Sequence, residues 1–447
     1  MALSLPWLVN RRRLMVAGFL DMVIVTLMFV ITYQGRFGAL PGLNLPMTWL
    51  LELWVLLSYV AGRYTQPRVG SPFAPLVGLG STAIVTVLAG LLYLSYNWFV
   101  HETLRQLDTR SFLLPLLFWI GLVSYAAQSL LDRLLARRYA RPLRWLLLGR
   151  ANWTSAMQSW SELRPTQVPL QLCPSDRCST TELAEVDGVV VDQPQAVVAA
   201  DQAALIDAMG QGLPVLSAGQ WCETFLQRLP PELISDADLL QGQFVVPSQG
   251  LQVRLKRLGD GVVSAILLLL ASPLLLLAAL LIWLQDRGPV FYSQWRSGLR
   301  GRPFRIWKLR TMRTDAERQG AQWVQQRDPR ITPLGRLLRL TRIDELPQLV
   351  AVLRGEMSLI GPRPERPEFD QELEQQIPHY RMRYWLRPGL SGWAQVNYPY
   401  GASLEDARNK LSFDLFYLRH FSFWLDLLIL LKTMRLVFNA RGALPQG

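Results

Sequence analysis

The sequence predicts a membrane protein with three parts. These are an N-terminal bundle of four transmembrane helices, a Rossmann-like α/β middle domain, and a monotopic α+β C-terminal domain with a re-entrant membrane helix and interfacial helices. Half of the 447 residues are apolar, and the mean hydropathy of +0.17 is high for a soluble chain. Short apolar runs alternate with helical stretches between residues 143 and 250. The net charge of +12 comes entirely from residues 251–447, which hold 29 basic and 17 acidic residues.

Residues 1–140 contain four apolar segments of roughly the length that crosses a bilayer, at about 14–33, 46–62, 75–99 and 112–131. The first segment is too long for the core of a signal peptide, and no small-residue cleavage site follows it. The arginines at 11–13 and the basic run after the fourth segment place the N-terminus and the next domain in the cytoplasm. Asp21 and Glu52 lie within these segments, and we expect structural roles for both.

The middle domain, residues 143–250, has the pattern of parallel strands joined by a crossover helix. The predicted strands are LRWLLLG, VPLQLC, DGVVVD and LPVLSAG, and the predicted helix is AVVAADQAALIDAMGQG. The turn after the first strand offers only Gly149 where a dinucleotide site has the spacing Gly-x-Gly-x-x-Gly. We therefore expect no bound nucleotide here and assign the domain a structural or regulatory role.

The predicted membrane helix at 258–284 has no charged residue between 262 and 284, and a straight helix of that length spans a bilayer. Pro273 follows Ser272 in the middle of this run, and proline kinks a helix. Both flanks are basic, so a crossing would place one of them outside, against the usual distribution of positive charge. A re-entrant helix that bends at Ser272 and Pro273 satisfies both observations, and an ordinary kinked span is the alternative.

The basic C-terminal part indicates anionic partners, such as lipid headgroups, phosphorylated lipids or nucleotides. Nucleic acid is not expected, because no nucleic-acid-binding motif is present. The three cysteines match no zinc or redox spacing, and the three histidines are scattered along the chain. Any catalysis must therefore depend mainly on carboxylates and arginines.

Two strands are predicted after the membrane helix, at 290–294 and 304–311, with a glycine-containing turn between them. The alternation of a strand puts Lys308 and Arg310 on one face. Paired cations in that position suit a diphosphate, and a solvated basic strand is the alternative.

Asp344 and Glu345 stand in the stretch TRIDELPQL, with arginines on both sides. Proline is tolerated in the first turn of a helix, so Pro347 predicts that Asp344 is the N-cap of a helix ending at Gly355. Its predicted buried stripe is Leu346, Leu349, Val350 and Leu353. Acidic stabilisation of a helix start is one account of the pair. A site for anionic oxygens is the other, in which one carboxylate attacks and the second holds Mg²⁺.

Arg363 lies between two prolines in GPRP, a rigid turn that presents its guanidinium for bidentate contact with phosphate or uracil. Further on, residues 413–438 are apolar but interrupted by charges, which predicts an interfacial helix rather than a span.

From about Lys256 to the C-terminus, the chain resembles the bacterial sugar transferases, the monotopic polyprenyl-phosphate phosphoglycosyl transferases. The matching stretches are KRLGD, ASP, GPVFYSQWRSG, WKLRTM, DPRITPLGRLLR, IDELPQL, LRGEMSLIGPRP and RPGLSGWAQVN. The N-terminal spans and the α/β domain resemble the long members of this family, close to the enzymes that move hexose-1-phosphate onto undecaprenyl phosphate.

The resemblance implies a two-step reaction at Asp344 and Glu345. Asp344 would attack the β-phosphate of a UDP-sugar and release UMP, and the polyprenyl phosphate would then take the phosphosugar from the carboxylate. Glu345 would hold Mg²⁺, and Arg363 would contact the uridine nucleotide. Phosphate would be bound by Lys308, Arg310 and Arg339, with Arg296 and Arg336 as further substrate-binding candidates. Ser272 and Pro273 would form the re-entrant bend, and the acceptor phosphate would lie by Lys256, Arg257 and Asp260.

The expected partners are a UDP-hexose, undecaprenyl phosphate and membrane lipids, and a homodimer is the assembly that the resemblance implies. The expected location is the bacterial inner membrane, and the reaction would initiate exopolysaccharide, capsule or O-antigen biosynthesis. Glucose and galactose are the favoured sugars, although VNYPYGAS departs from the family pattern and leaves the sugar open. Two alternatives stay open: a transporter with a lipid-binding gate, and a non-catalytic scaffold that binds polyprenyl phosphate.

Overall fold

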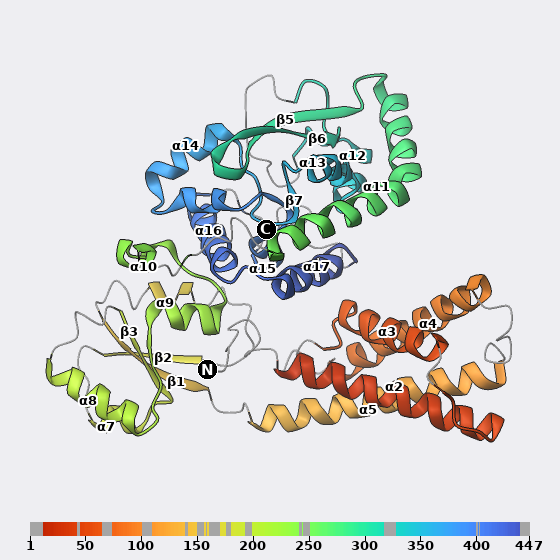
Figure 1. Ribbon diagram of the computed structural model, residues 1–447, viewed down its shortest axis with the longest axis horizontal. Helices are drawn as coiled ribbons and strands as arrows, with labels where there is room; N and C mark the ends of the chain where they lie inside the picture. Colours follow the sequence, from red (N-terminus) through yellow and green to blue (C-terminus); the bar gives the residue numbers. More distant parts are fainter. Residues whose placement is uncertain are drawn as a thin grey trace. The chain divides into compact units, whose positions relative to one another are not determined.

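The computed structural model describes residues 12–42, 45–64, 74–100, 110–138, 142–149, 156–157, 159–160, 170–175, 180–192, 199–240, 244, 251–316, 328–398, 401 and 403–438. The chain divides into two compact units. One consists of Met1–Leu146, Thr166–Cys173 and Thr180–Gly188, and the other of Leu147–Pro165, Pro174–Ser179 and Val189–Gly447. Figure 1 labels most of the helices and strands of both units.

Four apolar helices overlap the predicted membrane segments: α2 (Arg12–Phe37), α3 (Leu45–Val60), α4 (Ala74–Val100) and α5 (Arg110–Arg138). The segments Leu14–Phe37, Gly78–Tyr96 and Ser111–Leu134 are each long and apolar enough to cross a membrane. Helix α3 has 16 residues, or about 24 Å, which is shorter than a hydrocarbon core of roughly 30 Å. The four helices share a core that includes Phe29, Trp54, Tyr93 and Phe112. These helices mark the chain as a membrane protein.

Asp21 is fully buried in this helical bundle and is surrounded by hydrogen-bond donors. Its Oδ1 accepts from Ser124 over 2.6 Å and from Gln128 over 3.1 Å. Its Oδ2 accepts from the side chains of Tyr64 at 2.9 Å, Trp54 at 3.2 Å and Arg63 at 3.3 Å. The carboxylate therefore ties α2 to α3, to the residues after α3 and to α5, which is the structural role expected for it.

The middle of the chain forms a four-stranded sheet in the order β2-β1-β3-β4. The strands are β1 (Leu143–Leu148), β2 (Leu170–Ser175), β3 (Gly188–Val191) and β4 (Val215–Ser217), with helices α7 (Thr180–Ala184) and α8 (Ala199–Gly210). β3 and β4 are parallel, with Val189 opposite Val215. This is an α/β arrangement, and its Rossmann-like character stays a prediction. The turn that would hold a nucleotide lies, after Gly149, outside the described residues.

The segment after β4 packs against the C-terminal part of the chain. It contains α9 (Ala218–Trp221), the π-helix η3 (Cys222–Leu226), η4 (Pro231–Leu233) and α10 (Asp236–Leu240). Leu229, Ile234 and Phe244 share a hydrophobic cluster with Tyr380 and Leu415. Residues before 250, which the sequence predicts to be part of the middle domain, thus contribute to this core.

Helix α11 (Leu251–Asp286) has 36 residues and contains Pro273, whose missing N–H interrupts the helical hydrogen bonds. The hydroxyl of Ser272 donates to the carbonyl of Leu269 over 2.7 Å. Figure 1 shows α11 as a green ribbon that changes direction along its length. Its side chains are mostly exposed. Only 11% of its most apolar stretch is buried, as expected for a helix that contacts lipid.

Both halves of α11 contact the same small region, which requires this bend. In the first half, Arg257 donates to the carbonyls of Val352 and Leu353. In the second half, Ile282 belongs to a cluster against which Ile343 packs. A straight helix from Arg257 to Ile282 would measure about 38 Å, whereas the two short helices that hold Ile343 and Val352 measure roughly 20 Å together.

After α11, β5 (Phe291–Ser297), η5 (Leu299–Gly301) and β6 (Pro303–Leu309) form an antiparallel ribbon with Phe291 opposite Leu309. Phe304 and Ile306 pack into a core with Val352 and Met357. The chain continues through α12 (Pro333–Leu340), η6 (Ile343–Gln348), α13 (Leu349–Arg354), β7 (Ser358–Ile360), α14 (Pro367–Gln376), η7 (Tyr380–Trp385), β8 (Gly389–Ser391), α15 (Trp393–Asn397), α16 (Leu404–Arg419) and α17 (Phe423–Phe438). β7 and β8 pair in parallel.

The helix predicted to begin with Asp344 as its N-cap is wrong in two respects. Residues 343–348 form the 3₁₀-helix η6, whose N-cap is Arg342 in the left-handed region at φ 60°. Helix α13 then follows and ends at Gly355, as expected. Its buried residues are Leu349, Ala351 and Val352, whereas Leu353 is exposed. The fixed φ of Pro347 suits a 3₁₀ turn as well as an α-helical one, so Pro347 does not require an α-helix to start at Asp344.

The single interfacial helix predicted for residues 413–438 is also wrong. The stretch belongs to two helices, and α16 is a core helix whose Phe413 and Leu415 are fully buried. Helix α17 is separate and leaves Phe423 and Trp424 each 62% exposed. Its interfacial position stays a prediction, which these aromatic side chains support.

Candidate active site

Asp344 and Glu345 occupy the first turn of η6 and are both buried, at 7% and 8% exposure. The left-handed backbone of Arg342, which is uncommon for a residue other than glycine, turns the chain into η6 just before them. Strand β6 and helix α12 lie against η6 and supply Lys308 and Arg339. The site is therefore a pair of carboxylates held on a short, well-packed turn.

Glu345 accepts hydrogen bonds from two cations at one oxygen. Nη2 of Arg363 lies 2.7 Å from its Oε1, and Nζ of Lys308 lies 3.1 Å from the same atom. Arg342 approaches Oε2 at 3.6 Å. Burial by itself raises the pKa of Glu345, but the charges of Arg363, Lys308 and Arg342 outweigh it and hold the pKa well below its ordinary value. Glu345 is therefore ionised at any physiological pH.

Asp344 is in a different situation, because its Oδ1 is buried with no hydrogen-bond partner among the described residues. Burial raises its pKa to about 6, and the neighbouring charge of Glu345 acts in the same direction. The charges of Lys308, Arg339 and Arg342 oppose this shift. The result is a carboxylate that is ionised at pH 7 and has an oxygen with no hydrogen bond to disrupt before it reacts.

Of the predicted substrate-binding residues, Lys308, Arg363 and Arg296 come together. Lys308 is at the inner face of β6, and burial lowers its pKa against the opposing charge of Glu345. Arg296, on β5, donates to the carbonyl of Pro364, the residue after Arg363, over 3.2 Å. These cations make the surroundings of the two carboxylates suitable for an anionic substrate.

The other three predicted substrate-binding residues are placed differently. Arg310 lies just beyond the end of β6 and pairs with Asp286 at the end of α11, so its part in phosphate binding stays a prediction. Arg339 donates to the hydroxyl of Thr311 over 2.9 Å, and its charge still acts on Asp344. Arg336 is exposed on α12.

The residues predicted near the acceptor are engaged within the protein. Lys256 pairs with Asp426 of α17 over 2.7 Å, and Asp260 accepts from the hydroxyl of Ser358 over 2.7 Å. Arg257 caps the carbonyl end of α13, as described above. Together they fasten the first half of α11 to β7, α13 and α17.

The donor set suits Mg²⁺ better than any softer metal. No group of three or more His, Cys, Asp or Glu side chains that could enclose a metal occurs within the described ranges. A single ionised carboxylate such as Glu345 fits an ion that takes one or two protein carboxylates and completes its shell with water and phosphate.

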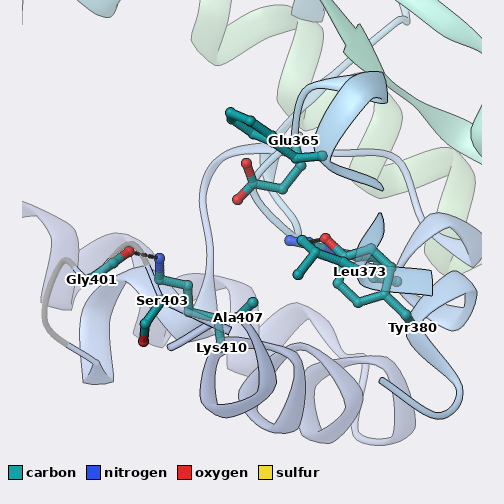
Figure 2. Close-up of a pocket in the computed structure, with 9 residues that line it drawn as sticks. Glu365, Leu373, Tyr380, Gly401, Ser403, Ala407 and Lys410 are labelled. Atoms are coloured by element: carbon teal, nitrogen blue, oxygen red, sulfur yellow. Dashed lines mark hydrogen bonds between the residues drawn. The ribbon is translucent and has the colours of Figure 1, made fainter. Parts of the chain in front are cut away.

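A pocket lies beside the turn that carries Arg363, and Figure 2 shows its lining. Its volume is about 20 Å³, and α14, η7 and α16 contribute most of its walls. Three of its side chains carry charge: Glu365, Arg383 and Lys410. Glu365 extends toward the open space in Figure 2, and Lys410 donates to the carbonyl of Gly401.

Three residues at or near the site were not predicted from the sequence to be site residues. Arg342 shapes the turn and faces Glu345, and Asp286 forms an ion pair with Arg310. Arg383 donates to the backbone of Arg363 over 2.9 Å. The stretch YRMRYW contains two arginines, and nothing in its pattern separates buried Arg383 from Arg381, whose side chain is 78% exposed.

A family model described as bacterial sugar transferase matches residues 251–440. The chain is 42% identical over 231 residues to a UDP-N-acetylgalactosamine-undecaprenyl-phosphate N-acetylgalactosaminephosphotransferase of Aeromonas hydrophila, covering 52% of this chain and 54% of that protein. It is 46% identical over 181 residues to a UDP-glucose:undecaprenyl-phosphate glucose-1-phosphate transferase of Caulobacter vibrioides, covering 40% of this chain and 68% of the relative.

A protein of Escherichia coli with the same glucose-1-phosphate transferase name is 40% identical over 190 residues. That match covers 42% of this chain and 41% of the relative. The matches therefore span between 41% and 68% of the length of these relatives. Both carboxylates and all the clustered cations lie within the matched region.

Proposed function

Because the chain belongs to the bacterial sugar transferase family, we propose that it transfers a hexose-1-phosphate from a UDP-sugar to undecaprenyl phosphate and releases UMP. The main support is the difference between the two carboxylates within the matched region. Glu345 is ionised and bound by cations, whereas Asp344 keeps one buried oxygen without a hydrogen bond. That pair provides a nucleophile next to a charged group that attracts cations.

In the first step, a carboxylate oxygen of Asp344 attacks the β-phosphorus of the UDP-sugar. The bond from that phosphorus to the bridging oxygen breaks, and UMP leaves with the electron pair. The product on the protein is an acyl phosphate that carries the sugar. Lys308 and Arg363 would stabilise negative charge on the phosphates after releasing Glu345 in part, and their contacts with Glu345 support this role.

In the second step, a phosphate oxygen of undecaprenyl phosphate attacks the same phosphorus. The acyl phosphate bond breaks, Asp344 returns as a carboxylate, and the products are undecaprenyl-diphosphate sugar and the free enzyme. Neither step needs a general base, because both nucleophiles are already anionic at pH 7.

Mg²⁺ would be held by Glu345 together with phosphate oxygens of the donor, and it would offset the charge of the reacting diphosphate.

The acceptor is a lipid, and the bent helix α11 with its exposed apolar side chains supports a re-entrant insertion that brings this lipid to the site. The proposed location is the bacterial inner membrane with the active site in the cytoplasm. The proposed pathway role is the first step of exopolysaccharide, capsule or O-antigen synthesis.

A panel of UDP-sugars tests the proposal, with UMP release measured for the purified full chain in detergent with undecaprenyl phosphate and Mg²⁺. The names of the relatives make UDP-glucose and UDP-N-acetylgalactosamine the first donors to test, with UDP-galactose beside them. We expect UMP from at least one donor and none from Asp344→Asn. Mass spectrometry without acceptor should find the phosphosugar on the peptide that contains Asp344. Equal release by Asp344→Asn would overturn the nucleophile, and folded wild-type protein inactive with every donor would favour a scaffold.

A further inference from the structure

Hydrogen bonds to four consecutive backbone carbonyls hold the turn that carries Arg363. Pro362 accepts from the N–H of Gly389 over 2.8 Å, and Glu365 accepts from the N–H of Ser297 over 3.0 Å. Between them, Pro364 accepts from the side chain of Arg296, and Arg363 itself accepts from Nη2 of Arg383 over 2.9 Å. Prolines on both sides of Arg363 fix two further backbone angles. The position of this backbone is therefore closely determined, and the side chain of Arg363 extends from it to Glu345.

Of the donors to these four carbonyls, Arg383 is the most deeply buried charged side chain. Its side chain is 6% exposed, and Asp414 of α16, at 2% exposure, pairs with it over 3.1 Å. Its Nη1 donates to the hydroxyl of Tyr380 over 2.5 Å. One guanidinium thus serves a carboxylate, a hydroxyl and the carbonyl of Arg363, which uses the fixed fork of arginine in three directions.

We propose that Arg383, held by Asp414 and Tyr380, is a positioning residue that sets where the guanidinium of Arg363 meets the nucleotide of the donor. This inference rests on the proposed function, because it takes Arg363 as a group that binds the uridine nucleotide. The hydrogen bond from Arg383 reaches Arg363 through the backbone carbonyl, and no hydrogen bond or ion pair links Arg383 to Asp344 or Glu345 among the described residues. Losing this charged donor is costly, because it would leave the carbonyl of Arg363 without its hydrogen bond in the interior, where water cannot replace the donor.

The test measures binding of UMP to the full chain by titration calorimetry, with Arg383→Lys as the main variant. Lysine keeps a positive charge beside Asp414, so the buried pair survives, but one ammonium cannot replace the three-way fork. We expect UMP affinity to fall about tenfold, the usual scale for losing one charge-assisted hydrogen bond in a binding site. The melting temperature is recorded alongside, and Arg383→Met combined with Asp414→Asn serves if the lysine variant does not fold.

Arg381→Lys is the matched control. It lies on the same 3₁₀-helix, and its exposed side chain pairs with Glu374 over 3.3 Å. We expect this control to bind UMP as the wild type does. An unchanged UMP affinity in folded Arg383→Lys would overturn the proposal.

A double-mutant cycle separates positioning from general loss of structure. In an Arg363→Ala background, the change Arg383→Lys should cause no further loss of UMP affinity, because the side chain it positions is gone. An equal loss in both backgrounds would show that Arg383 acts by another route and would overturn the proposal.

Hydrogen–deuterium exchange gives a readout that needs no ligand. Faster exchange in the peptide from Gly361 to Phe369 is expected for Arg383→Lys and not for Arg381→Lys. If wild-type protein binds no UMP, the proposed function fails on that result, and the exchange comparison alone decides whether Arg383 fixes the turn. Equal exchange in the two variants would then overturn the positioning role.

Discussion

Asp344 and Glu345 follow one another in the chain and are both buried, yet their surroundings shift their pKa values in opposite directions. Glu345 has Arg363 and Lys308 on one oxygen, and these charges overcome the effect of burial. Asp344 has no such partner on Oδ1, so burial raises its pKa to about 6. The ionised form of Asp344 therefore carries a free-energy cost at neutral pH that Glu345 does not.

Asp344→Asn should make the protein inactive and more stable. A folded-state pKa of about 6 against 3.8 for the free side chain means that stability falls as pH rises between those values. The shift corresponds to roughly 1–3 kcal/mol, and asparagine removes the charge that causes it. We expect no UMP release and a melting temperature a few degrees higher at pH 7.5, with the gain shrinking toward pH 4. Asp315→Asn, at an exposed acid, is the control and should leave both unchanged.

The rate of UMP release should decrease as the pH falls through about 6. Below that pH Asp344 becomes protonated, and a neutral carboxyl group is a poor nucleophile, whereas Glu345 stays ionised throughout. The measurement is kcat/KM for the best UDP-sugar between pH 5 and 8, with the melting temperature recorded at each pH. A flat profile in protein that remains folded would contradict the assignment of Asp344 as the attacking group.

The sequence predicted which side chains lie together near Glu345 better than it predicted the local backbone. Adjacent carboxylates among arginines, with GPRP downstream, pointed to Asp344, Glu345 and Arg363 as site residues, and the structure brings the last two together over 2.7 Å. The prediction of Asp344 as an N-cap was wrong. The fixed φ angle of Pro347 fits a 3₁₀ turn as well as the first turn of an α-helix, so proline does not distinguish the two.

Other residues were beyond the reach of sequence patterns because their roles depend on contacts far along the chain. Arg310 lies two residues after Lys308, as the strand alternation requires, but the strand ends at Leu309 and Arg310 forms an ion pair with the distant Asp286. In the same way, α16 has the composition of an interfacial helix, yet its apolar face is covered by Leu229 and Tyr380 from distant segments. Composition fixes how apolar a helix is and does not say what covers it.

Glu345→Gln should raise the Mg²⁺ concentration needed for half-maximal UMP release. Glutamine keeps the shape of the side chain but loses the charge that attracts both the metal and the cations around it. We expect a shift on the order of tenfold and a lower maximal rate, measured by Mg²⁺ titration in chelator-treated buffer. Glu356→Gln, at an exposed acid after α13, is the control. An unchanged Mg²⁺ requirement would remove Glu345 from the metal site.

Asp21→Ala should destabilise the helical bundle without changing the chemistry. The substitution leaves Arg63 buried, at 4% side-chain exposure, without its carboxylate, and breaking such a pair costs about 3–5 kcal/mol. We expect a clearly lower melting temperature in detergent and a normal rate of UMP release per folded molecule. Adding Arg63→Met should recover part of the loss, because an apolar side chain removes the uncompensated charge. Glu52→Ala, at an exposed position of α3, should have little effect.

The bend of α11 predicts that both of its ends face the same side of the membrane. Arg257 and Ile282 contact neighbouring short helices, so the two ends return to one domain. In a variant without native cysteines, single cysteines at the exposed positions Arg254 and Gln285 should react alike with a membrane-impermeant maleimide. Both should be protected in intact spheroplasts and labelled in inverted vesicles. A cysteine at Gln285 that reacts in intact spheroplasts, while one at Arg254 does not, would establish a simple span and rule out the re-entrant helix.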